Sequence, residues 1–171
     1  MATTCTSPFT APDTNLVESP SDMAWSPDGT IAYTLGTEKT PADVWVRPGR
    51  GDALQLADLN RNLLGKRELA DVHDIVYELS VDGTEIQGWY LMPPDVDPDK
   101  QYPMILEIHG GSHLACGPHF SAELQRMAAE GFVVFYANHR ASSGYGREFV
   151  MLLEYKDSSK DDFGDHMSGV D

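Results

Sequence analysis

Two apolar runs on either side of a short amphipathic segment constrain the fold of this chain more than any other feature. Residues 103–109 and 132–138 are nearly continuous apolar stretches, which are typical of strands covered on both faces of a sheet. Residues 121–130 lie between them and carry apolar side chains at helical spacing. Strand, helix and strand in this order predict two parallel strands joined by a right-handed crossover. The fold class is therefore α/β.

Local signals support this reading. Ser121 is placed to cap the N-terminus of the predicted helix, and Gly131 is placed to end it. Upstream, two alternating runs meet at Asp82-Gly83, which predicts a β-hairpin. Downstream, residues 146–156 and 161–171 have helical patterns, and the second pattern begins with acidic residues that suit the positive end of a helix.

The N-terminal third has a different organisation. Residues 1–19 are rich in Thr, Ser and Pro and are expected to be a loose lead-in. Residues 20–56 contain short strand candidates and a turn in "SPDG", and this pattern predicts an antiparallel meander about the size of one β-propeller blade. Residues 57–72 have mixed charge and no clear period, so they are assigned as a linker, and residues 73–171 form the α/β part.

Composition excludes several classes of function. The formal net charge of −15 over 171 residues makes nucleic acid an unfavourable partner. The N-terminus lacks the features of a signal peptide, and no stretch is apolar enough to span a membrane. Two cysteines, Cys5 and Cys116, give no disulfide framework, so a reducing, cytoplasmic location is expected.

The segment after the first apolar run contains four residues with metal-binding chemistry. His109, His113, Cys116 and His119 supply enough ligands for a tetrahedral zinc site. However, all four would come from one glycine-rich loop, and no carboxylate is placed behind them. We therefore favour ordinary loop and strand-end histidines, and we expect neither a metal nor another cofactor.

Gly110 and Gly111 support a different interpretation of the same loop. A strand that ends in His-Gly-Gly before a loop and a helix is typical of the oxyanion loop of α/β-hydrolases. Backbone N–H groups there stabilise the negative charge that develops during acyl transfer, and glycine lets the backbone approach closely. Taken alone, paired glycines are a weak signal, because they often form only a turn.

Six segments in order resemble the prolyl oligopeptidase family of serine peptidases, especially its acylaminoacyl-peptidase and dipeptidyl-peptidase-like branch. The matching segments are "WSPDGTIAY…DVWV", "LNRNLL", "SVDGTEIQGWYLMPP", "YPMILEIHGGSH", "ELQRMAAEGFVVFYANHRASSGYGREF" and "DDFGDHMSGVD". The resemblance implies the last blade of a β-propeller followed by the N-terminal half of an α/β-hydrolase domain. It also implies that the backbone N–H of Gly111 is the oxyanion donor and that Gly110 shapes the turn.

The chain departs from the family pattern in three places. Ser112 replaces the usual proline after the glycines, and residues 138–142 read Asn-His-Arg-Ala-Ser rather than Asn-Pro-Arg-Gly-Ser. No Gly-x-Ser-x-Gly elbow occurs in the 171 residues, so the serine, acid and histidine of the family's triad are not present. Ser112, Ser142 and Ser143 are poor nucleophile candidates, and His166 is interpreted as a surface or packing residue.

The sequence therefore predicts part of a serine peptidase that hydrolyses peptide substrates through an acyl-enzyme. Residues 140–146 favour the peptidase branch over an esterase of the same fold. A non-catalytic chain that binds partners through exposed strand edges is the third alternative, and such edges would make the isolated chain prone to form homo-oligomers. Arg140 follows a buried strand, and we expect it to be partly buried and paired with Asp162 or Asp165.

Overall fold

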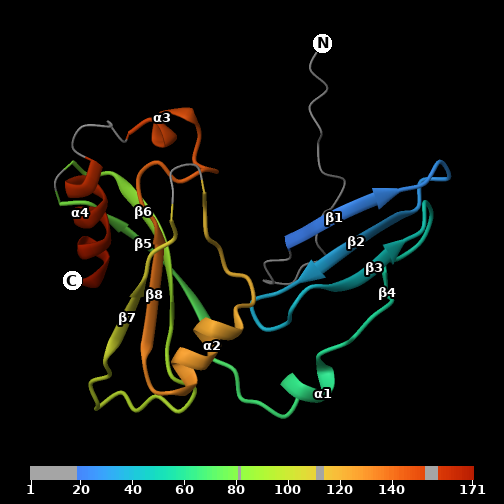
Figure 1. The fold of residues 1–171 in the computed structure, drawn as a ribbon, viewed down its shortest axis with the longest axis horizontal. Coiled ribbons are helices and arrows are strands. Elements are labelled where there is room, and N and C mark those ends of the chain that lie inside the picture. Colours follow the sequence, from blue (N-terminus) through green and yellow to red (C-terminus); the bar gives the residue numbers. More distant parts are fainter. Residues whose placement is uncertain (1–18, 81, 111–113, 153–157) are drawn as a thin grey trace.

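The computed structural model describes residues 19–80, 82–110, 114–152 and 158–171. They form two four-stranded sheets, and the segment that connects the sheets carries α1, Arg61–Leu64 (Figure 1). Within these ranges, no helix has both the length and the apolar character needed to cross a membrane.

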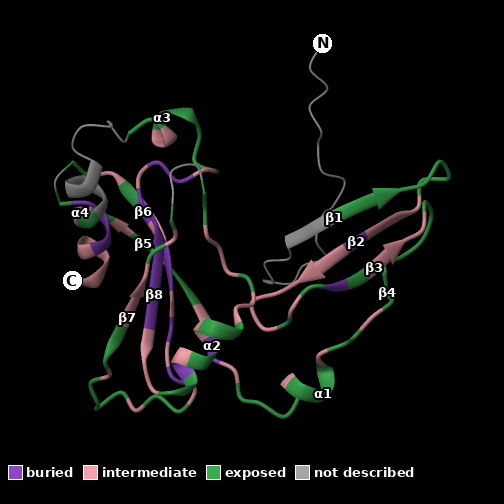
Figure 2. Cartoon of the chain, viewed as in Figure 1, coloured by how far each residue is buried: buried purple, intermediate pink, exposed green. Residues whose placement is uncertain are grey.

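The first sheet is an antiparallel meander with the strand order β1-β2-β3-β4. Its strands are β1 Ser19–Trp25, β2 Ile31–Gly36, β3 Asp43–Arg47 and β4 Leu54–Gln55. The predicted turn between β1 and β2 is confirmed, because the Gly29 N–H donates to the Ser26 carbonyl at 3.0 Å and Gly29 has a φ of 84°. Most described side chains of this sheet are at least partly exposed (Figure 2). Its assignment as a propeller blade stays a prediction.

The second sheet has the strand order β5-β6-β8-β7. Its strands are β5 Val72–Glu78, β6 Glu85–Leu91, β7 Met104–Glu107 and β8 Val133–Asn138. β5 and β6 pair antiparallel across the predicted hairpin, where Gly83 has a φ of 73° and Asp82 accepts a hydrogen bond from the Thr84 N–H at 3.0 Å.

The predicted strand–helix–strand unit is confirmed. β7 and β8 are parallel, and α2, Ala122–Ala129, connects them. The Ser121 hydroxyl accepts a hydrogen bond from the Leu124 N–H at 3.3 Å, as expected of an N-cap, and Gly131 follows the helix with a φ of 92°. The carboxyl ends of β7 and β8 therefore lie at one edge of the sheet.

Apolar side chains cover both faces of this sheet, and β8 is its most buried strand (Figure 2). Successive β8 residues alternate between two clusters: Val134 and Tyr136 pack beneath α2, whereas Phe135 and Ala137 pack on the opposite face. That opposite face is covered in part by α4, Ser158–Val170, which contacts β5 and β8. Helices on both faces explain why the two parallel strands read as continuous apolar runs.

The helix predicted over residues 146–156 is shorter within the described residues, and residues 153–156 lie outside them. α3 spans only Arg147–Val150, and residues 151 and 152 form a turn. Met151 and Leu152 are 64% and 41% exposed, so these two side chains would add little buried apolar surface to a longer helix. The helix predicted from residue 161 onward is confirmed as α4, which begins three residues earlier.

Gly169 in α4 gives a test of this packing. A Cβ at Gly169 would lie 2.5 Å from Phe135 Cζ and 2.7 Å from Tyr77 Cζ, whereas a Cβ at Gly164 would meet no atom within 4 Å. We expect Gly169→Ala to lower the free energy of unfolding by about 1–3 kcal/mol through overpacking, despite alanine's higher helix propensity. Gly164→Ala in the same helix should instead raise it by up to about 1 kcal/mol. Urea unfolding of both variants measures the difference, and equal effects would contradict this packing of α4.

Candidate functional site

The candidate site lies where β7 and β8 end side by side. His109 follows β7, and the segment that follows β8 begins with His139. Ser142 Oγ lies 3.2 Å from His109 Nε2, and the ring centroids of His109 and His139 are 4.7 Å apart. The loop that leaves β7 is therefore held beside the loop that leaves β8.

The two glycines predicted to form the oxyanion loop are only partly described. Gly110 is exposed, and a Cβ built on it would meet no atom within 4 Å. Gly111, the predicted donor, lies outside the described residues, as do Ser112 and His113. The roles of Gly110 and Gly111 therefore stay predictions.

Of the four residues with metal-binding chemistry, His113 lies outside the described residues, and the other three do not form a metal-binding group. Cys116 Sγ donates to Asn138 Oδ1 at 3.0 Å, and burial raises the pKa of the Cys116 thiol to about 12. Within the described residues, no three His, Cys, Asp or Glu side chains are arranged to hold a metal ion. A thiol with so high a pKa stays protonated at neutral pH and makes a poor nucleophile.

Ser142 and His109 superficially resemble a nucleophile and its base. However, the Ser142 side chain is completely buried, so no substrate carbonyl can reach its oxygen. His109 Nδ1 is also buried and has no hydrogen-bond partner among the described residues, whereas a catalytic histidine needs an orienting acid there. This pair is therefore structural.

The predicted ion pair of Arg140 is confirmed, and its partner is Asp165. Arg140 Nε and the terminal nitrogen Nη2 donate to the Asp165 carboxylate at 3.0 and 2.8 Å, and the Arg140 backbone N–H donates to it at 2.9 Å. The Arg140 side chain is 11% exposed and Asp165 is fully buried. The other terminal nitrogen, Nη1, reaches the more exposed Asp82 at 3.0 Å. Arg140 thus joins β8, α4 and the β5–β6 hairpin beneath the site.

His166 is a packing residue, one of the two roles predicted for it, and it is 2% exposed. Its ring centroid lies 4.9 Å from that of His139, so the structure brings together His109, His139 and His166. Burial, followed by the nearby imidazole of His139, lowers the pKa of His166 to about 4. Sequence reasoning missed this cluster, because its members are 30 and 27 residues apart. Histidines placed at the ends of two predicted parallel strands were the available signal.

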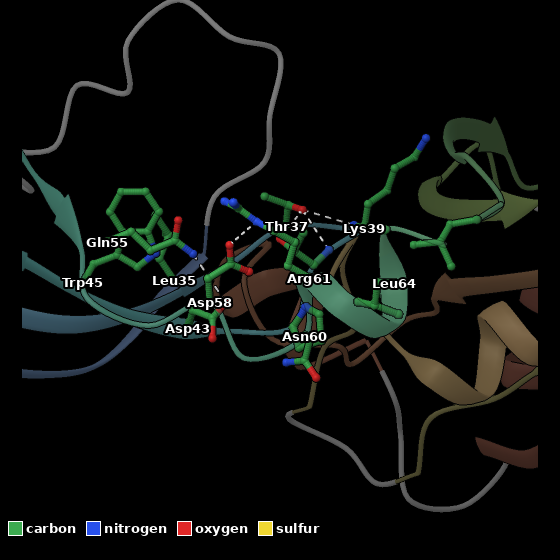
Figure 3. A pocket seen from close by; sticks show the side chains of 14 residues that line it. Leu35, Thr37, Lys39, Asp43, Trp45, Gln55, Asp58, Asn60, Arg61 and Leu64 are labelled. Carbon is green, nitrogen blue, oxygen red and sulfur yellow. Dashed lines mark hydrogen bonds and ion pairs between the residues drawn. The ribbon is translucent and has the colours of Figure 1, made fainter. Parts of the chain in front are cut away.

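A separate hollow of about 410 Å³ lies between the first sheet and α1 (Figure 3). Its charged groups are engaged locally: Arg61 pairs with Asp58, and the buried Asp43 carboxylate accepts from the Gln55 amide at 3.4 Å and the Leu59 N–H at 3.3 Å. This hollow is lined by residues 35–69 and not by the ends of β7 and β8. We therefore do not assign it to the candidate site.

The second sheet, with its parallel pair and helices on both faces, defines an α/β protein. Residues 118–171 match a family model described as "Prolyl oligopeptidase family". The relationship to this family that the sequence motifs predict is confirmed.

Individual relatives agree with this assignment. "Uncharacterized peptidase YuxL" of Bacillus subtilis is 34% identical over 131 residues, which are 77% of this chain and 20% of that protein. "Probable dipeptidyl-peptidase 5" of Aspergillus terreus is 30% identical over 129 residues, 72% of this chain and 18% of that protein. The solved structure of Pyrococcus horikoshii acylaminoacyl peptidase superposes with a TM-score of 0.75 at 28% identity, covering 87% of this chain and 23% of that one. The chain thus spans about a fifth of the length of these relatives.

Proposed function

We propose that this chain supplies the oxyanion-loop side of the active site of a serine peptidase that acts through an acyl-enzyme. The observation that carries the proposal is the strand end: β7 runs parallel to β8, and His109-Gly110 follow β7 at the sheet edge where α/β proteins bind ligands. The family match adds the class of chemistry, and the printed names of relatives suggest acylaminoacyl- or dipeptidyl-peptidase substrates.

In this proposal the backbone N–H of Gly111 donates to the oxyanion and Gly110 shapes the turn. A donor of this kind is expected to contribute about 3–4 kcal/mol of transition-state stabilisation. Ser142 is buried, Cys116 stays protonated and His109 is structural. None of these three side chains is therefore assigned as a nucleophile. The nucleophile, acid and base would come from outside these 171 residues.

Two readouts test the proposal. First, the open reading frame beyond codon 171 is read, because a Gly-x-Ser-x-Gly elbow there favours the peptidase and an immediate stop codon favours a non-catalytic binding protein. Second, the complete gene product is assayed on acyl-peptide, dipeptide and simple ester substrates. Cleavage of peptides in preference to esters is the expected result, and cleavage of esters alone would instead favour the esterase alternative.

We expect Gly111→Pro, which removes the donor N–H, to lower kcat of the complete enzyme by about 10²–10³-fold. Gly111→Ala, which keeps the donor N–H, is the control and should lower kcat much less. Equal losses in both variants would contradict the assignment of Gly111.

A further inference from the structure

The side chain of Asn138, the last residue of β8, makes an unusually complete set of hydrogen bonds. Its Oδ1 accepts from the Cys116 N–H at 2.8 Å and from Cys116 Sγ at 3.0 Å. Its Nδ2 donates to the Cys116 carbonyl at 3.0 Å and to the Tyr145 hydroxyl at 2.7 Å. Asn138 is 2% exposed, so two donors and two acceptor positions of one buried amide are all used.

These contacts replace backbone pairing that the loop itself lacks. Residues 114–117 belong to no helix or strand, yet the N–H and the carbonyl of Cys116 must find partners once they leave water. Asn138 supplies both partners at once, much as a neighbouring strand would. A single side chain therefore fixes the position of the loop backbone at Cys116.

The Tyr145 hydroxyl extends the contact to a third element. It donates to Gln87 Oε1 in β6 at 2.8 Å while it accepts from Asn138. Burial raises the pKa of Tyr145, so the phenol stays protonated and can donate at physiological pH. The loop is thereby tied to β6 as well as to β8.

Two further contacts come from the segment that follows β8. The Ser143 N–H donates to the Leu114 carbonyl at 2.9 Å, and Ser142 contacts His109 where the loop leaves β7. Both sides of residues 110–113 are therefore attached to the same segment. Asn138 makes the largest number of these attachments.

We infer that Asn138 is the positioning residue of residues 114–117, which belong to the loop between β7 and α2, with Tyr145 and Gln87 holding its amide in orientation. It fixes the loop without contacting a substrate. This inference rests on the proposed function only for its catalytic meaning, since the loop carries the proposed oxyanion donor. The attachment itself can be measured in the 171-residue chain.

Cys116 provides the readout, because its half-buried thiol donates to Asn138 Oδ1 and should react faster with an aromatic disulfide reagent when the loop opens. The experiment uses the chain with Cys5→Ser, so that Cys116 is the single thiol. In native buffer, Asn138→Leu should raise the labelling rate of Cys116 by about 30-fold, because it removes several buried hydrogen bonds. Tyr145→Phe, a milder change at a partly exposed residue, should raise it by about 3- to 10-fold.

Gln125→Leu is the matched control. Gln125 is a buried amide in α2 that binds the backbone of Ala70 instead of Cys116. It accepts from the Ala70 N–H at 2.8 Å and donates to the Ala70 carbonyl at 3.0 Å. It should lower the unfolding midpoint in urea, yet change the labelling rate by less than about 3-fold, because the loop at Cys116 stays attached.

An equal rate increase in Asn138→Leu and Gln125→Leu would mean that Cys116 reports global unfolding, and the inference would be overturned. An unchanged rate in Tyr145→Phe would overturn it as well, and this variant decides the matter if Asn138→Leu does not fold. Because labelling needs no catalytic serine, a failure of the proposed peptidase activity leaves this result interpretable.

Discussion

Asp165→Asn is expected to lower the free energy of unfolding of this chain by about 3–5 kcal/mol. The substitution removes the charge that faces the Arg140 guanidinium, which is 11% exposed and cannot lose its proton. Arg140 would keep the more exposed Asp82, but removing the buried partner of a buried ion pair is strongly destabilising. Since domains of this size are stable by about 5–15 kcal/mol, much of the total would be lost.

Two further variants test whether the loss of stability comes from the ion pair or from a general disruption of α4. Asp82→Asn alters the second, 40% exposed partner of Arg140 and should cost less than about 1 kcal/mol. The double variant Arg140→Met with Asp165→Asn removes both charges, so it should be more stable than Asp165→Asn alone. Urea titrations followed by circular dichroism give the three values. A double variant less stable than Asp165→Asn would show that the charge pair is not the source of the effect.

Acidification between pH 6.5 and about 4 is expected to destabilise the chain through His166. The pKa of His166 falls from its ordinary value of 6.5 to about 4 in the folded chain, so the unfolded chain binds the proton more tightly. The stabilisation is therefore fully present above pH 6.5 and is lost as the pH falls toward 4. A shift of this size corresponds to about 3 kcal/mol.

The groups around His166 explain why the proton is unfavourable there. His139 and His109 lie on one side, and the neighbouring Asp165 carboxylate is already engaged by Arg140. His166→Leu should flatten the dependence of the unfolding free energy on pH in this window, whereas His119→Leu, at a histidine outside the cluster, should leave it unchanged. A His166→Leu variant with the same pH dependence as the parent chain would contradict this account.

The parts of the fold that were predictable depend on short-range patterns. The apolar runs at residues 103–109 and 132–138 predicted the parallel pair, because strands buried on both faces need continuous apolar side chains. Ser121 and Gly131 located the ends of α2 through capping chemistry that acts over a few residues. A buried guanidinium requires a carboxylate nearby, which predicts Asp162 or Asp165 as the partner of Arg140, and the structure has Asp165.

The remaining features depend on distances in space that periodicity does not encode. His166 contacts His139 because α4 packs across β8. The Asn138 amide contacts Cys116 because two strand ends are adjacent. The helix predicted for residues 146–156 ends at Val150 within the described residues, where Met151 and Leu152 are largely exposed and would add little buried surface to a longer helix. Candidate site residues were thus easier to find along a strand than across a sheet edge.

Labelling with a serine-directed fluorophosphonate probe tests the central claim most directly, because the probe reports an activated serine without requiring knowledge of the substrate. The claim is that this chain contributes the oxyanion loop but not the nucleophile, since no Gly-x-Ser-x-Gly occurs in it and Ser142 is fully buried. We predict no stoichiometric labelling of the purified 171-residue chain, together with no hydrolysis of acyl-peptides or esters. Stoichiometric labelling mapped by mass spectrometry to Ser112 or Ser142 would contradict the account.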